Sequence, residues 1–194
     1  MPGPCYDVAM HLPTHALASW LVAESGPART ARRERILVLC AGLIPDLDAL
    51  SLLGGVEAYQ RWHRIVLHNA LAAFACALLF GLLARPGLRL ATGLLALVGY
   101  HLHLLCDLVG SAGPDGSNWP IPYFVPFSHR PIEFSGQWGL ASWQNVTFTV
   151  ALLIASWALA VRRGRTVIEA LSPRADLAVV EVAKRRWPLS APLR

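Results

Sequence analysis

The chain has 194 residues, of which 55% are hydrophobic and 15% are charged, and its mean hydropathy is +0.45. This composition is too apolar for a soluble domain of this size and indicates a protein surrounded by lipid. The net charge of +5 does not indicate nucleic-acid binding, because the arginines form short clusters between apolar runs and are not interleaved with aromatic residues. Membrane lipid is the expected partner, and protein partners are unknown from the sequence.

Five apolar runs are candidates for transmembrane helices, and they cover residues 9–23, 36–54, 66–84, 88–110 and 145–161. The first two contain Pro13 and Pro45, so we expect them to be broken or only partly inserted. The third and fourth are each long enough to cross a hydrocarbon core of about 30 Å as a helix. Pro86-Gly87 lies between them and predicts an antiparallel hairpin. The fifth run ends at a pair of arginines and predicts the last span.

Two further segments complete the chain. Residues 111–143 are rich in Pro, Gly and aromatic residues, which predicts an ordered loop at the headgroup level. Residues 162–194 are basic and predict a cytoplasmic tail or a short surface helix. The sequence therefore predicts an all-α fold, a polytopic membrane helix bundle with about four to five transmembrane helices, divided into a transmembrane domain over residues 1–161 and a tail over 162–194.

The arginines predict the orientation of this bundle. With five spans, three arginines fall on one side, Arg61, Arg64 and Arg130, and many more fall on the other, Arg29, Arg32, Arg33, Arg35, Arg85, Arg89, Arg162, Arg163 and Arg165. Because positive residues concentrate on the cytoplasmic side, the richer side is predicted to be cytoplasmic. The N-terminus and the loop 111–143 are then extracytoplasmic.

Histidine and aspartate residues gather at the extracytoplasmic side of this topology. A charged side chain in the bilayer centre costs on the order of 2.5 to 3.5 kcal/mol by insertion scales and needs a reason. Four separate segments bring such residues to one depth, namely His15, Asp46, Asp48, His63, His68, His103 and Asp107. A shell of imidazole and carboxylate groups suits zinc, with manganese or iron as alternatives. The sequence therefore predicts a divalent metal site that faces the extracytoplasmic side.

Local spacing supports part of this site. His103 and Asp107 are four residues apart and share one face of a helix, whereas His101 points elsewhere and is expected to be a packing residue. Pro45 can loosen the turn that follows it, so that both Asp46 and Asp48 turn inward.

Catalytic roles can be assigned to three of these polar residues. Either Asp46 or Asp48 is a candidate general base, and Arg64 is a candidate for holding an anionic substrate.

Each feature also has a structural interpretation. His15 alone fits a capping residue, Asp46 with Asp48 fits a polar helix break, and His103 with Asp107 fits a hydrogen-bonded packing pair. Arg64 alone fits a contact with lipid headgroups. It is the joint occurrence of these residues at one depth that favours metal binding.

The ordered motifs resemble the YdjM-like family of membrane-bound proteins regarded as metal-dependent hydrolases. The resemblance covers roughly residues 10 to 128 and is carried by Thr14-His15, PDLD at 45–48, His63-Arg64 with His68, HLLCD at 103–107 and the later WPIPYFVPFS. One departure is RIVLHN at 64–69, where the family pattern is Arg-Gly-x-Thr-His-Ser. The resemblance implies a bacterial inner-membrane protein whose metal ligands are His15, Asp46, Asp48, His63, His68, His103 and Asp107.

The expected reaction is hydrolysis of a phosphoester or ester of a lipid or lipid-linked substrate by metal-activated water. The alternative is a non-enzymatic membrane protein, either a cation transporter or a scaffold that the metal stabilises. A transporter would need polar residues at several depths, but ALLFGLLA at 77–84 and LATGLLAL at 90–97 have none.

Overall fold

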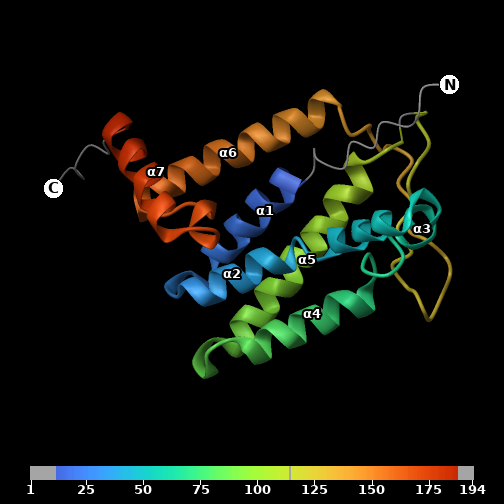
Figure 1. The fold of residues 1–194 in the computed structure, drawn as a ribbon, viewed down its shortest axis with the longest axis horizontal. Coiled ribbons are helices and arrows are strands. Elements are labelled where there is room, and N and C mark those ends of the chain that lie inside the picture. Colours follow the sequence, from blue (N-terminus) through green and yellow to red (C-terminus); the bar gives the residue numbers. More distant parts are fainter. Residues whose placement is uncertain (1–11, 114, 188–194) are drawn as a thin grey trace.

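The computed structural model describes residues 12–113 and 115–187, which fold into helices joined by short turns and one long loop (Figure 1). In chain order the α-helices and 3-10 helices (η) are α1 (Leu12–Ser25), η1 (Pro27–Thr30), α2 (Arg32–Ala41), η2 (Pro45–Gly54), α3 (Val56–Trp62), α4 (Ala70–Leu83), η3 (Pro86–Leu88), α5 (Arg89–Gly110), α6 (Trp143–Arg163), η4 (Val167–Ala170) and α7 (Pro173–Arg186). The described residues contain no strand, only two isolated bridges. The predicted all-α class is confirmed.

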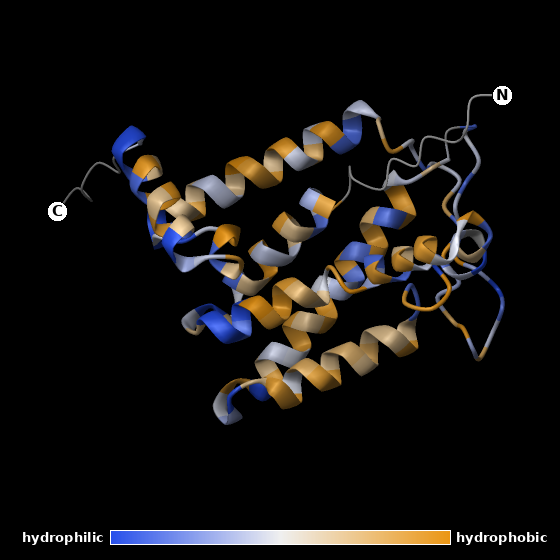
Figure 2. Ribbon diagram, in the orientation of Figure 1, coloured by the Kyte–Doolittle hydropathy of each residue, from blue (hydrophilic) through white to orange (hydrophobic). Residues whose placement is uncertain are grey.

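Fewer helices qualify as membrane spans than the four to five that the sequence predicts. The segments Pro86–Gly110 and Trp143–Arg163 are long and apolar enough, and α2 with η2 qualifies as a pair that is bent by 58°. Helices α1 and α4 have 14 residues each, about 21 Å at 1.5 Å per residue. Figure 2 shows that α4 is hydrophobic along its length. By length and composition, the described residues therefore contain two or three candidate spans.

The two prolines that interrupt the early runs have different effects. Pro13 lies in the first turn of α1, where no intrahelical partner for its missing N–H is required, so α1 continues through it. Pro45 starts η2 after the break that follows α2. The expected interruption therefore occurs at Pro45 and not at Pro13.

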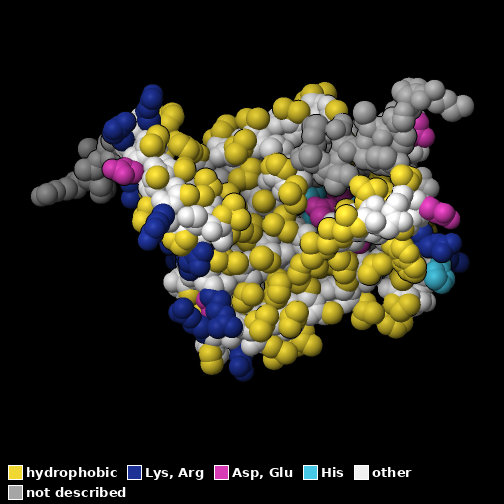
Figure 3. Space-filling view, in the orientation of Figure 1, with side chains coloured by type: hydrophobic (Ala, Val, Ile, Leu, Met, Phe, Trp, Pro, Cys, Tyr) yellow, Lys and Arg dark blue, Asp and Glu magenta, His cyan; other side chains and the backbone are white. Residues whose placement is uncertain are grey.

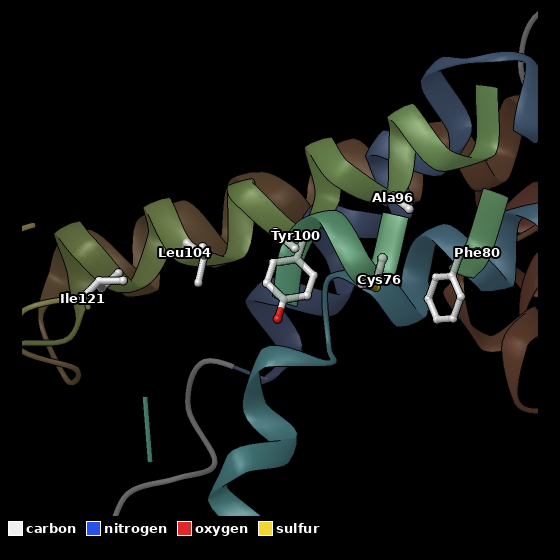
Figure 4. Close-up of a cluster of buried hydrophobic side chains, with 8 residues drawn as sticks. Cys76, Phe80, Ala96, Tyr100, Leu104 and Ile121 are labelled. Carbon is white, nitrogen blue, oxygen red and sulfur yellow. The ribbon is translucent and has the colours of Figure 1, made fainter. Parts of the chain in front are cut away.

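Helix α5 is at the centre of the bundle and packs against α4, α1 and α2, while α6 packs against α1. Gly81 and Gly93 allow α4 and α5 to approach closely, since a Cβ atom at Gly93 would lie 3.1 Å from the carbonyl oxygen of Ala77. Figure 4 shows the core beside this contact, which includes Cys76 and Phe80 of α4 and Ala96 and Tyr100 of α5. This packing fixes the face of α5 that carries the polar residues described below.

The end of the molecule opposite the histidines is held by ion pairs that we call the Glu24 cluster, made of Glu24, Arg35, Arg163, Arg165 and Glu169. Glu24 is 1% exposed, and its oxygens accept hydrogen bonds from Arg163 Nη1 at 2.6 Å and from Arg165 Nε at 2.7 Å. Arg35 binds both carboxylate oxygens of Glu169. The hydrogen bonds to Glu24 raise the pKa of the Arg165 guanidinium above its ordinary value. Figure 3 shows Lys and Arg gathered at this end, with hydrophobic side chains over the middle of the molecule.

The basic C-terminal segment folds back onto this end. Helix α6 continues past the predicted domain boundary at residue 161 and ends at Arg163, and η4 and α7 follow. Asp176 of α7 accepts hydrogen bonds from the backbone N–H and the hydroxyl of Thr166 at 2.7 and 2.6 Å. Of the two sequence expectations for residues 162–194, the described part therefore forms a helix, which packs on α6.

The long loop between α5 and α6 is ordered by hydrogen bonds. The side chain of Gln137 donates to the carbonyl oxygen of Asp107 at 2.9 Å and accepts from the backbone N–H of Trp119 at 2.6 Å. Asn145 of α6 donates to the carbonyl oxygen of Gly110 at 2.7 Å. These bonds hold the loop against the end of α5 that carries the histidines.

Candidate metal centre

Four side chains from three separate elements converge into one group, which we call the His/Asp quartet. It consists of His15 from α1, Asp46 from η2, and His103 and Asp107 from α5. One donor atom from each residue lies within 4.8 Å of all the others. The quartet is buried apart from Asp46, whose side chain is 28% exposed. Two imidazoles and two carboxylates at this spacing match the mixed nitrogen and oxygen shells that bind divalent ions.

The local sequence explains how α5 and η2 present these groups. His103 and Asp107 are one helical turn apart, so they share a face of α5. The bend between α2 and η2 turns Asp46 toward that face and frees the carbonyl oxygen of Gly42, which lies 2.8 Å from His103 Nδ1. Because that carbonyl can only accept, Nδ1 carries the proton and Nε2 presents its lone pair to the quartet.

The distances in the quartet leave room for a shared ion. His103 Nε2 lies 3.6 Å from Asp46 Oδ1 and 3.6 Å from Asp107 Oδ2, which is too long for a hydrogen bond. Within the described residues this buried nitrogen has no hydrogen-bond partner. The His15 and His103 rings stack with centroids 3.7 Å apart, and His15 Nε2 lies 3.3 Å from Asp107 Oδ1. A buried lone pair facing two carboxylates is the arrangement that a cation would satisfy.

A second set of side chains, the Asp48 group, adjoins the quartet and consists of Asp48, His63, Arg64 and His68. Asp48 accepts hydrogen bonds from His63 Nδ1 at 2.7 Å, from the Arg64 backbone N–H at 2.7 Å and from His68 Nδ1 at 2.9 Å. The other ring nitrogen of His68 lies 3.1 Å from Asp107 Oδ2. His68 thus joins Asp48 to the quartet.

Arg64 has an unusual backbone and a well-anchored side chain. Its φ is +66°, a left-handed conformation that is uncommon for residues other than glycine, and this turn aims its N–H at Asp48. Its Nη2 donates to Ser111 Oγ at 2.6 Å and lies 3.5 Å from Asp107 Oδ2. Its guanidinium carbon lies 4.7 Å from the centre of the Trp119 ring, within cation–π range.

The two sets together carry an excess of negative charge. They contain three carboxylates, Asp46, Asp48 and Asp107, and one permanent cation, Arg64. His68 adds a second positive charge if both its ring nitrogens, which face carboxylate oxygens, bear protons. With the other imidazoles neutral, as metal ligation requires, the formal charge remains negative, and buried charge of one sign requires a counter-ion. The donor atoms and the charge therefore both fit a divalent cation.

The structure thus brings all seven predicted ligands to one region but divides them. His15, Asp46, His103 and Asp107 form the quartet, whereas Asp48, His63 and His68 are joined by hydrogen bonds beside it. His101 does not join either set, because its ring nitrogens lie 2.8 Å from the Leu97 carbonyl oxygen and 2.8 Å from the Tyr123 hydroxyl, as expected for a packing residue.

Several residues that build the site were not singled out from the sequence. Gly42 positions His103, Ser111 holds Arg64, and Gln137 ties the loop to α5. Ser111 follows Asp107 by one helical turn, a spacing that a search for polar residues on the same face would have found. Asn69, one of the departures from the family motif, caps α4 by accepting a hydrogen bond from Ala72 N at 2.9 Å. Its role here is structural.

A comparison with models of protein families finds a match over most of the chain. The model of a protein family described as YdjM inner membrane protein matches residues 10–187, which include both sets of residues described above. No curated protein and no solved structure gives a match.

Proposed function

Because the chain belongs to the YdjM inner membrane protein family, we propose that it is an inner-membrane, metal-dependent hydrolase. The observation that carries this proposal is the His/Asp quartet, whose four donor atoms lie within 4.8 Å of one another. We place its site on the extracytoplasmic side, because the arginine-rich Glu24 cluster occupies the opposite end of the bundle.

In this proposal His15, Asp46, His103 and Asp107 hold a divalent ion, zinc first and manganese or iron as alternatives. A bound ion of this kind lowers the pKa of water to about 7 and polarises a carbonyl or phosphoryl oxygen. The protein supplies the position of the ligands, since the Gly42 carbonyl fixes the His103 ring and the Asp48 group fixes His68.

The remaining predicted residues take roles that follow from their contacts. Asp48 holds His63 and His68 in place, because both of its oxygens already accept hydrogen bonds. If one of the two aspartates acts as a general base rather than as a ligand, Asp46 is the better placed, since its side chain is partly exposed. Arg64 is a cation beside the quartet and is suited to an anionic substrate. The position of the site beside a candidate span favours a lipid or lipid-linked phosphoester or ester.

Metal analysis of the detergent-purified protein tests this proposal first. We expect stoichiometric metal in the wild type and its loss in His103→Ala and Asp107→Ala, with helical content by circular dichroism unchanged. His101→Ala is the matched control, since it removes a histidine of the same helix that faces Tyr123, and it should retain the metal. Metal-loaded wild type should then hydrolyse phosphoesters or esters, and the ligand variants should not.

Two results would contradict the proposal. A wild type that takes up no zinc, manganese or iron would exclude the metal site. A wild type that binds metal but hydrolyses no phosphoester or ester would favour the scaffold alternative, which the geometry makes reasonable because the quartet joins α1, η2 and α5. In a scaffold, loss of a ligand should lower thermal stability.

A further inference from the structure

A cavity of about 370 Å³ opens beside the Asp48 group. Two of that group's members, His63 and Arg64, line it, together with Tyr59, Ile65, Trp119 and prolines of the long loop. The lining of the cavity therefore includes basic and aromatic side chains, and the cavity lies next to the predicted reaction centre. Of its lining residues, His63 donates a hydrogen bond to Asp48, and Arg64 forms an ion pair with Asp107.

Arg64 is the residue of this cavity whose bonding is incomplete. The residue is 9% exposed, and its Nη2 is held by Ser111. Its Nε and Nη1 are buried and have no hydrogen-bond partner within the described part of the chain. Unmet buried donors are costly, and a guanidinium N–H group donates a charge-assisted hydrogen bond to an oxygen atom of a phosphate or carboxylate. Trp119 holds the guanidinium plane from one face, so the donors are oriented before any ligand arrives.

A second, apolar groove of about 340 Å³ continues from this cavity. Ile65 lines both spaces. The groove is further lined by Val66, by Ala72 and Ala75 of α4, and by Pro126 of the long loop. Ala75 and its neighbour Phe74 are exposed on a helix that is hydrophobic along its length. The combined space is thus basic at one end and hydrocarbon-lined at the other.

We propose that this space binds an amphiphile with a phosphate headgroup, whose phosphate is held by Arg64 and whose hydrocarbon chain passes Ile65 and lies along α4. Phosphate is the anionic group that membrane lipids carry most widely, and its oxygen atoms can accept hydrogen bonds from the unmet guanidinium donors of Arg64. This inference rests on the proposed function and names the substrate class of that site. It also predicts a dependence on metal: the carboxylates beside Arg64 repel an anion, and a divalent cation in the quartet would offset that repulsion.

Native mass spectrometry of the full chain in a neutral detergent tests the headgroup site. The probes are dioctanoyl phosphatidic acid, dioctanoylglycerol and inorganic phosphate, each with zinc-loaded and with metal-free protein. We expect phosphatidic acid to bind more tightly than either other probe, and more tightly with zinc. Arg64→Gln should weaken phosphatidic acid binding about tenfold or more, and Arg64→Lys, which keeps the charge but has a single ammonium in place of the guanidinium donors, should weaken it less.

The path of the ligand's hydrocarbon chain is tested separately with Ala75→Trp, which places an indole ring in the groove. It should weaken phosphatidic acid binding several-fold and leave inorganic phosphate binding unchanged. Ala155→Trp is the matched control, because Ala155 is an exposed alanine on α6, remote in sequence from the groove, and it should bind both probes as the wild type does.

The outcomes separate this inference from the proposed function. If Arg64→Gln, shown to be folded by circular dichroism, binds phosphatidic acid as tightly as the wild type, the headgroup site is wrong even if the protein hydrolyses esters. If Ala75→Trp and Ala155→Trp behave alike, the chain path is wrong. If phosphatidic acid binds through Arg64 but no phosphoester or ester is hydrolysed, the binding site stands and the hydrolase does not.

Discussion

The two ends of the bundle each bury a set of charged residues, and the two sets are completed in different ways. In the Glu24 cluster the carboxylates of Glu24 and Glu169 are hydrogen-bonded to arginines at about normal distances, and the arginines outnumber the glutamates. In the His/Asp quartet the buried Nε2 of His103 lies 3.6 Å from two carboxylates without bonding to either. The carboxylates of the Glu24 cluster are paired with arginines of the protein. In the quartet, a buried nitrogen has no hydrogen-bond partner among the described residues and the carboxylates are in excess.

The two clusters differ in whether the fold alone accounts for their buried charges. A cluster whose hydrogen bonds are complete is explained by the fold, and the Glu24 cluster fastens α1, α2, α6 and the C-terminal segment together. A cluster that is incomplete in the same molecule requires a ligand to explain it. Substitutions at the two ends should therefore differ in their dependence on metal, and four predictions test this.

The largest effect is expected from Glu24→Gln. It leaves Arg163 and Arg165 without their carboxylate partner, and loss of one partner of a buried ion pair costs roughly 3 to 5 kcal/mol. We expect about 3 kcal/mol, since these arginines are partly exposed. Thermal unfolding in detergent, followed by tryptophan fluorescence, measures this loss of folding stability. In metal-free protein Asp46→Asn should cost far less, because the Asp46 side chain is 28% exposed and lies 3.6 Å from His103 Nε2, too far for a hydrogen bond; equal losses in the two variants would abolish the distinction between the ends.

Metal removal should destabilise the protein only through the quartet. An ion present at about a hundredfold above its Kd stabilises the folded state by roughly 2.7 kcal/mol, so chelation of the wild type should lower the unfolding temperature. Asp107→Ala should show no such change. Glu24→Gln, although less stable at the outset, should lose as much on chelation as the wild type does. A larger chelation effect in that variant would mean that the two ends are coupled.

Gly42→Ala should disturb the quartet through the backbone. A Cβ atom at this position would lie 1.7 Å from Ser19 Oγ, and the Gly42 carbonyl holds the His103 ring. Overpacking of this kind costs about 1 to 3 kcal/mol, and metal affinity measured by competition with a chelating dye should fall as well. The double variant Ser19→Gly with Gly42→Ala removes the clash and should recover most of both losses; failure to recover would mean that Gly42 is needed for another reason.

Arg85→Ala should have the smallest effect. Its side chain is 64% exposed and lies 3.8 Å from Glu34, and exposed ion pairs contribute about 0 to 1 kcal/mol. Glu34 keeps the hydrogen bond from the Arg85 backbone N–H at 3.0 Å. Thermal unfolding should therefore be close to that of the wild type, with and without metal. A marked loss would show that the arginine-rich end depends on more than the Glu24 cluster.

The sequence predicted which histidines and aspartates lie in one region because the evidence for it was local. His103 and Asp107 are one turn apart on a helix, and the position of Pro45 before Asp46 and Asp48 predicted an irregular turn there. The distribution of the arginines then predicted a topology in which the four segments reach one depth. The division of the seven residues into a quartet and an Asp48 group depends on the orientation of each ring and carboxylate, and residue spacing does not carry that information.

Helix lengths and long-range partners were harder to predict. Hydropathy gave the run 66–84, but Asn69 caps α4, so the helix begins at Ala70 and is too short to qualify as a span by itself. The basic C-terminal residues resemble a solvated tail until their partners are known, and Glu169 meets Arg35 across more than a hundred positions of sequence. The contact of Arg64 with Trp119 likewise depends on the path of an irregular loop.

The bend between α2 and η2 gives the quartet a hinge. Asp46 is its one member on η2, while the other three stand on α1 and α5, two helices that pack directly against each other. The distance from Asp46 to the rest of the quartet is therefore set by the bend, 58° in this structure. If the quartet holds an ion as proposed, a smaller ion would draw η2 closer to α5 than a larger one, so the angle between α2 and η2 would depend on the radius of the ion.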